Sequence, residues 1–170
     1  MRIKIFLLMI VVFTSLILLS SDASAKGGSK VILKDFQGDK PNNRPILQRW
    51  TGDYPVAQLD RLPVGQSQSR VGYIGDAETF ASVWQALKPG TALPQVDFNK
   101  NLVVFVRNVK SYHPTLVEKV TLKDGVAEIV AAEPLTPVQP IEDRVALGLA
   151  VISREGLKFI HADNEQIPVR

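Results

Sequence analysis

Two histidines, His113 and His161, are the side chains of this 170-residue chain that most readily act as a general base or a metal ligand near neutral pH. Asp163 and Glu165 follow His161 at intervals of two residues, so a strand that continued past Ile160 would project all three from one face. An imidazole and two carboxylates could hold a divalent cation, with water in the remaining positions. The polar character of this segment and the nearby C-terminus favour a solvated tail instead, and we predict that no metal is bound.

The other histidine lies in a polar segment with an aromatic and a basic neighbour. Pro114 follows His113 and restricts it to an extended conformation. Loops are usually solvated surface, so we expect a loop histidine rather than a catalytic base. Because tyrosine is a favoured anchor at protein interfaces, we predict that Lys110, Tyr112 and His113 bind a partner.

Residue types that carry chemistry are otherwise scarce. The absence of cysteine excludes disulfides, thiolate metal sites and a cysteine nucleophile. The chain also lacks the G-x-S-x-G nucleophile elbow, the H-E-x-x-H zinc motif, the phosphate-binding G-x-x-x-x-G-K-[ST] loop and the calcium loop. Asp97 is expected to accept a hydrogen bond from the backbone of the turn at residues 99–101 rather than to act as an acid. We therefore predict no catalytic residue and no cofactor.

The charge distribution argues against a nucleic-acid partner. The formal net charge is +3 at pH 7, and the basic residues are scattered singly along the chain. Nucleic-acid binding requires a concentrated positive surface that displaces counterions.

The N-terminal 25 residues have the three-part pattern of a secretory signal peptide. A basic start is followed by an apolar run over residues 5–19 and by an A-x-A arrangement that ends at Ala25. An uncleaved membrane anchor is the alternative, but it needs about 20 apolar residues. We expect cleavage after Ala25, a periplasmic or secreted mature chain, and no stable membrane insertion.

One helix and several strands are predicted to follow. Residues 26–69, rich in proline, glycine and polar residues, are expected to be a loosely ordered segment with one or two short strands, and residues 70–170 a compact domain. Asp76 is a natural N-cap for a helix over residues 77–87. Its apolar positions recur at helical spacing: Phe80, Val83, Trp84 and Leu87.

The strand pattern predicts a sheet against which this helix packs. Residues 102–106 form a continuous apolar run, and two glycine-containing turns are expected to close hairpins over 117–122/126–131 and 145–152/157–161. Along 145–152, small residues alternate with large ones, and the small face is expected to receive the helix. Phe80, Trp84, Leu87, Val104 and Leu149 should then share one core. The predicted class is α+β, with one amphipathic helix on an antiparallel sheet built from a central strand and two hairpins.

These motifs resemble the C-terminal domain of the PrcB family of protease-complex subunits. The resemblance rests on Phe80 and Trp84 in an F-x-x-x-W helix, then Leu93-Pro94, Asp97-Phe98 and the strand at 102–106. It covers roughly residues 70–161. Family members carry a glycine-rich segment with a tyrosine after that strand, whereas residues 108–114 keep the tyrosine and lack the glycines. The resemblance implies an exported, non-catalytic accessory domain that binds another exported protein.

Two functional classes therefore follow from the sequence. The first is an exported, non-catalytic binding or accessory domain of the cell envelope, such as a subunit or chaperone of a secreted complex. The second is a small periplasmic hydrolase or metal-binding protein that uses His113 or His161. An enzyme needs several polar groups that converge in one pocket, and this requirement separates the two classes.

Overall fold

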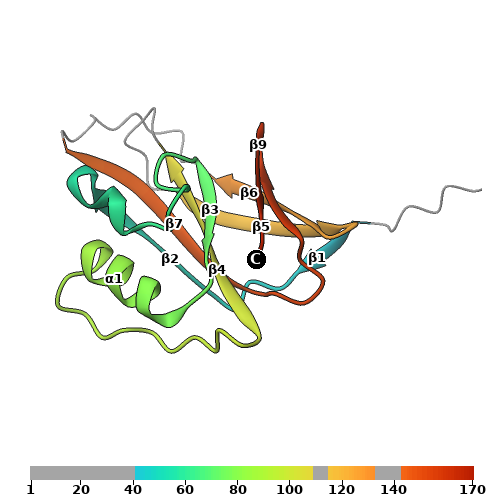
Figure 1. The fold of residues 1–170 in the computed structure, drawn as a ribbon, viewed down its shortest axis with the longest axis horizontal. Helices are drawn as coiled ribbons and strands as arrows, with labels where there is room; N and C mark the ends of the chain where they lie inside the picture. The colour runs from blue at the N-terminus through green and yellow to red at the C-terminus, as the bar shows by residue number, and fades with distance from the viewer. Residues whose placement is uncertain (1–40, 109–114, 133–142) are drawn as a thin grey trace, which may run out of the picture. The chain divides into compact units, whose positions relative to one another are not determined.

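Two β-sheets and a single α-helix organise the part of the chain that the computed structural model describes, which is residues 41–108, 115–132 and 143–170 (Figure 1). The four-stranded sheet has the order β2-β7-β4-β3, and the five-stranded sheet has the order β1-β5-β6-β8-β9. All neighbours are antiparallel except β6 and β8, which are parallel. The structure is thus mostly β-sheet with a small helix, as the α+β class requires, but the single predicted sheet is wrong.

The elements have the following bounds. The four-stranded sheet contains β2 (Gln48–Pro55), β3 (Val71–Ile74), β4 (Asn101–Asn108) and β7 (Arg144–Ser153). The five-stranded sheet contains β1 (Asn42–Arg44), β5 (Leu116–Lys123), β6 (Val126–Ala132), β8 (Phe159–Ala162) and β9 (Glu165–Pro168). The helical elements are the 3₁₀-helix η1 (Val56–Arg61) and the α-helix α1 (Ala77–Leu87).

Helix α1 begins and ends where the sequence predicts. The Asp76 carboxylate accepts hydrogen bonds from the backbone N–H of Thr79 at 2.8 Å and from its hydroxyl at 2.9 Å, which satisfies one of the free donors of the first turn. The predicted stripe is buried, and it packs with Leu147, Leu149 and Val151 of β7. The N-cap and the apolar spacing of this helix are therefore confirmed.

Strand β7 is buried on both faces, but the two faces are used in the opposite way to the prediction. The large side chains Leu147, Leu149 and Val151 face α1. The small face meets the second sheet, because Ala150 packs in the core between the sheets and a Cβ built on Gly148 would collide with the Thr115 carbonyl oxygen. A small side chain is needed where another backbone approaches, and here that backbone is the residue directly before β5 rather than a helix.

Three layers result, namely α1 with η1, the four-stranded sheet and the five-stranded sheet (Figure 1). Phe80, Trp84, Leu87 and Leu149 are buried together between the first two layers, as predicted. The prediction is wrong for Val104, which points to the opposite face of β4 and packs between the two sheets. Successive residues of a strand face opposite sides, so Val104 lies opposite Val103 and Phe105.

One predicted hairpin is present and the other is absent. Strands β5 and β6 are joined by Asp124 and Gly125, whose φ angles of 53° and 85° are the positive values that a tight two-residue hairpin uses. The predicted hairpin of 145–152 with 157–161 is wrong, because β7 and β8 belong to different sheets. The segment between them turns at Gly156, with φ 70°, and the chain there crosses from one sheet to the other. A glycine turn marks such a crossing as readily as a hairpin.

The described residues before Arg70 contribute one strand to each sheet. Strand β1 pairs with β5, and β2 pairs with β7 over its full length of 8 residues. They correspond to the one or two strands that we predict within residues 26–69, the segment expected to be loosely ordered. The described residues on either side of Arg70 belong to one compact unit, Gln37–Arg170.

Some predictions concern residues outside the described ranges. These are the signal peptide at 1–25 and the segment at 109–114 that contains Lys110, Tyr112 and His113. Within the described ranges, no helix has the length and apolar character needed to cross a membrane.

The close contact at Gly148 gives a first prediction. We expect Gly148→Ala to lower the free energy of unfolding by about 1–3 kcal/mol, because the new methyl group forces the Thr115 backbone away from β7. Gly75→Ala is the matched control, since a Cβ there meets its nearest atom, a ring carbon of Tyr73, at an ordinary 3.5 Å. Urea unfolding of both variants measures the difference. Equal stabilities would show that the sheets do not depend on this approach.

Candidate functional site

The structure separates His161, Asp163 and Glu165, the candidate metal set for which we predict no bound metal. Strand β8 ends at Ala162, Asp163 occupies a turn with φ 52°, and β9 then begins at Glu165. The continuous strand that the hypothesis required is therefore absent. Across the described residues, no group of three or more histidine, aspartate and glutamate side chains is placed to hold a metal ion.

Each of these three side chains contacts a residue outside the set. His161 Nδ1 lies 3.7 Å from Glu128 Oε2 on the neighbouring strand β6. Asp163 Oδ2 lies 2.8 Å from Arg70 Nη1, and Glu165 Oε2 accepts a hydrogen bond of 2.7 Å from the Arg70 backbone N–H. The two carboxylates thus tie the β8–β9 turn to the residue that precedes β3.

Next to this contact lies a buried arginine, Arg107, which is not among the residues that we predict from the sequence to be functional. Arg107 of β4 is only 4% exposed, and its Nη2 donates to the Gln68 carbonyl at 2.5 Å. Burial lowers the pKa of Arg107, and attraction to the Glu165 carboxylate opposes this shift. Arg107 follows the apolar run at 102–106 directly, and this placement at the end of a buried strand is the signal that could have revealed it.

Asp97 behaves as predicted. Its Oδ1 accepts a hydrogen bond of 3.1 Å from the Asn99 backbone N–H, and its carbonyl accepts from Lys100 and Asn101. These bonds shape the turn that leads into β4.

The predicted binding loop has two buried ends. Asn108 is 5% exposed and Thr115 is fully buried, and the Thr115 carbonyl accepts a hydrogen bond of 2.8 Å from the Thr51 hydroxyl. Lys110, Tyr112 and His113 lie between these ends, outside the described residues. The structure therefore describes the base of this loop and leaves its binding role a prediction.

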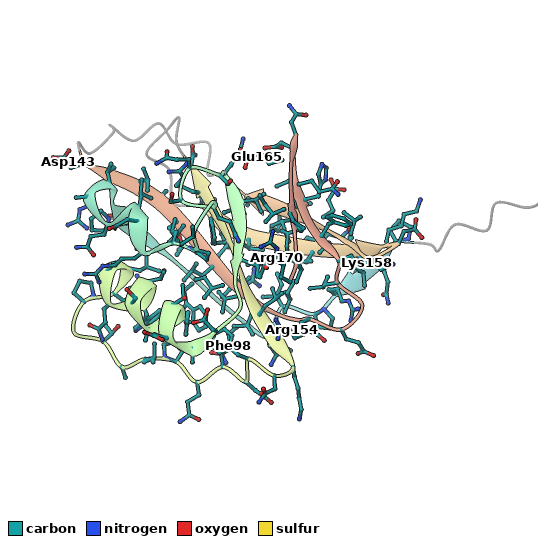
Figure 2. The ribbon with its side chains drawn as sticks, in the orientation of Figure 1. Phe98, Asp143, Arg154, Lys158, Glu165 and Arg170 are labelled. Carbon is teal, nitrogen blue, oxygen red and sulfur yellow. The ribbon has the colours of Figure 1, made fainter. Side chains whose placement is uncertain are left out.

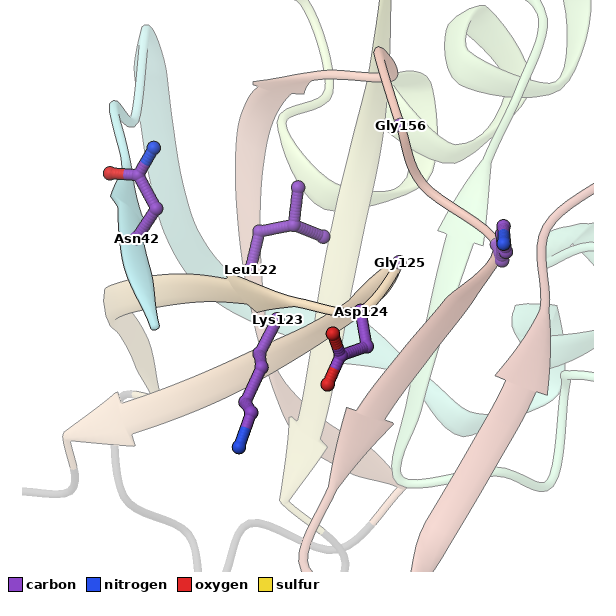
Figure 3. Close-up of a pocket in the computed structure, with 7 residues that line it drawn as sticks. Asn42, Leu122, Lys123, Asp124, Gly125 and Gly156 are labelled. Atoms are coloured by element: carbon purple, nitrogen blue, oxygen red, sulfur yellow. The ribbon is translucent and has the colours of Figure 1, made fainter. Parts of the chain in front are cut away.

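A hollow of about 700 Å³ lies beside the β5–β6 turn and was not predicted from the sequence (Figure 3). We call it the inner hollow, because Leu122, which forms part of its wall, packs against the core between the sheets. Its lining residues are Asn42, Leu122, Lys123, Asp124, Gly125, Gly156 and Lys158. They come from β1, from the end of β5, from the hairpin turn and from the segment that leads into β8.

Cationic groups predominate around the inner hollow. Lys123 and Lys158 line it, and the only carboxylate among its lining residues is Asp124. Arg44 lies next to Gly156: its Nη2 donates to the Glu155 carbonyl at 2.5 Å, and its buried Nε has no hydrogen-bond partner. Figure 3 shows the Lys123 side chain pointing away from Leu122, so Lys158 and Arg44 are the cations on the inward side, and the excess of positive charge favours an anionic group.

Two further hollows adjoin β5, which also lines the inner hollow. One of about 310 Å³, which we call the outer hollow, is lined by Pro41, Thr121, Lys123, Asp124, Val126 and Glu128. The other, of about 570 Å³, contains Asn43, Arg44 and Arg49 together with residues of β5 and β6. Three of the hollows in the described residues therefore border β1 or the residue before it.

Comparison with known proteins gives no match: no family model, no curated protein and no solved structure matches this chain.

The contacts of Glu165 give a second prediction. Glu165→Ala removes the acceptor of the Arg70 N–H and a carboxylate whose negative charge attracts the buried Arg107 guanidinium. We therefore expect the free energy of unfolding to fall by about 1–3 kcal/mol. Glu155→Ala, which removes an exposed side chain, should change it by less than about 0.5 kcal/mol. Thermal and urea unfolding of both variants measure the difference in stability. If the two variants unfold alike, β9 is held by its apolar contacts alone.

Proposed function

We propose that the mature chain is an exported, non-catalytic binding domain of the cell envelope that holds another exported protein. The observation that carries this proposal is the edge of the five-stranded sheet at β1, which is bordered by hollows and by cationic side chains. The resemblance of residues 70–161 to the PrcB family supports the same class of function. A role as a subunit or chaperone of a secreted complex is consistent with both.

The arrangement of polar groups supports binding over catalysis. His161 has Glu128 as its charged neighbour, and that carboxylate is 57% exposed on the open face of the sheet. Catalysis needs several groups that converge on one reacting atom in a sheltered pocket. None of the three hollows described above has a histidine among its lining residues.

Export is supported by the pattern of residues 1–25, with its basic start, apolar run and small-residue site at Ala25. The proposed partner is accordingly a protein of the periplasm or of the extracellular space.

A third prediction compares His161 with Tyr112, which belongs to the predicted binding segment. We expect His161→Ala to leave folding and partner recovery unchanged, because His161 lies in β8, outside the segment of Lys110, Tyr112 and His113 that is predicted to bind the partner. Tyr112→Ala should reduce recovery of the partner about tenfold, as the loss of one aromatic anchor does. Tagged variants expressed in a deletion strain of the source organism, with quantitative mass spectrometry of co-purified envelope proteins, measure this.

Circular dichroism of each variant separates loss of binding from loss of fold. A folded histidine variant that loses biological activity would favour the hydrolase or metal-binding alternative.

A further inference from the structure

The hollow of about 570 Å³ that contains Arg44 and Arg49 lies where β1 ends and the chain crosses to β2 of the other sheet (Figure 1). We call it the arginine hollow. Strand β1 pairs with residues 120–122 of β5, and no described strand pairs with residues 118–119 on that side. The arginine hollow is therefore a notch beyond the end of β1, beside the part of β5 that β1 leaves uncovered.

The two arginines reach this hollow from different sheets. Arg44 is paired with Val120 of β5, and Arg49 is paired with Ala150 of β7. Residues directly opposite each other in an antiparallel pair share one face of the sheet. Val120 and Ala150 are both buried in the core between the sheets. Arg44 and Arg49 therefore start from the two sheet faces that are turned toward each other, at the margin of that core.

Positive charge is in excess in the arginine hollow. Lys119 is a third cation among its lining residues, and the only carboxylate among them is that of Glu118. Arg49 and Lys119 are exposed, and within the described ranges neither forms an ion pair. An anion placed in the hollow would be attracted to all three cations.

Arg44 is the cation that the structure holds in place. Its Nη2 donates to the Glu155 carbonyl at 2.5 Å, which fixes the guanidinium at the margin of the core. Its Nε is buried without a hydrogen-bond partner, so the described chain does not satisfy all of its donors. A guanidinium that is already fixed loses little further freedom on binding, and its planar donors match the oxygens of a carboxylate or a phosphate.

The size of the arginine hollow and its apolar residues favour an organic anion over a bare ion. Its volume of about 570 Å³ falls within the range of about 300–1,000 Å³ that is typical of pockets for small organic ligands. Its lining includes Val130, which is 42% exposed, and the half-buried Ile46. An apolar group of a ligand can cover these two side chains and remove their surface from water.

We propose that the arginine hollow binds a small organic anion. The carboxylate or phosphate group of this ligand contacts the cations Arg44, Arg49 and Lys119. Its apolar part covers Ile46 and Val130. The ligand is distinct from the exported protein partner, so this inference goes beyond the proposed function.

Probes that separate charge from apolar area test this directly. Hexyl phosphate and hexanoate carry both features, inorganic phosphate and acetate carry the anion alone, and hexylammonium carries the same chain with the opposite charge. Each is titrated into the ¹⁵N-labelled mature chain, residues 26–170, and the amide spectrum is recorded. We expect both hexyl anions to shift the amides of Arg44, Lys119 and Val130 saturably. They should bind at least about tenfold more tightly than hexylammonium and about fivefold more tightly than their short counterparts. The tighter of the two identifies the oxyanion as a phosphate or a carboxylate.

Matched charge reversals locate the site. Arg49→Glu should weaken the binding of hexyl phosphate at least about tenfold, because it replaces a cation of the hollow with a group that repels the ligand. Arg144→Glu is the control and should leave binding unchanged. Arg144 is exposed and lies about 20 Å along β7 from the residue that pairs with Arg49. Its neighbour Asp143 lies far from Lys158 in Figure 2, and Lys158 belongs to the segment beside Arg44.

Three results would overturn the inference. Hexylammonium or the short anions could bind as tightly as the hexyl anions, the shifts could map away from the arginine hollow, or a folded Arg49→Glu variant could bind as the unchanged chain does. If Arg49→Glu does not fold, Lys119→Glu takes its place with the same expected loss. Recovery of the protein partner is measured separately, so this inference and the proposed function fail independently.

Discussion

The approach of β7 to the start of β5 is the constraint on which the layered structure depends. At Gly148 the two backbones are so close that a side chain would meet the Thr115 carbonyl, and the Thr51 hydroxyl donates to that same oxygen at 2.8 Å. The opposite face of β7 carries leucine and valine side chains toward α1. Strands β4 and β7 are thereby buried on both faces, and the four-stranded sheet serves as the middle layer between a helix on one side and a sheet on the other.

Local signals predicted the elements that local interactions determine. The N-cap at Asp76 and the turn at Asp124-Gly125 depend on neighbouring residues, so α1 and the β5–β6 hairpin agree with the sequence. The assignment of strands to two sheets depends on distant contacts. The Gly156 turn therefore gave no indication that β8 pairs with β6 in parallel rather than with β7. The alternation of small and large residues along β7 was recognised, but composition alone does not reveal which layer covers which face.

The same distinction applies to the candidate sites. The set of His161, Asp163 and Glu165 depended on an uninterrupted strand, and the turn at Asp163 removes that condition. The hollows beside β1 could not be predicted, because Asn42, Lys123 and Lys158 are far apart in sequence and meet only through strand pairing. Among the described strands, β1 is the outermost of its sheet, and hollows with lysine and arginine side chains adjoin it. The proposed binding role rests on this combination.

Amide hydrogen exchange of the mature chain, measured by NMR under native conditions, tests the central claim that the four-stranded sheet is the shared middle layer. We expect amides in Leu102–Val106 of β4 and in Leu147–Ile152 of β7 to be the slowest, with opening free energies equal to that of global unfolding, because neither face of this sheet is released until both outer layers are lost. Amides of α1 and of β5 and β6 should exchange at or below that value. Exchange of β7 through an opening well below the global value, while β5 and β6 remain protected, would contradict the account.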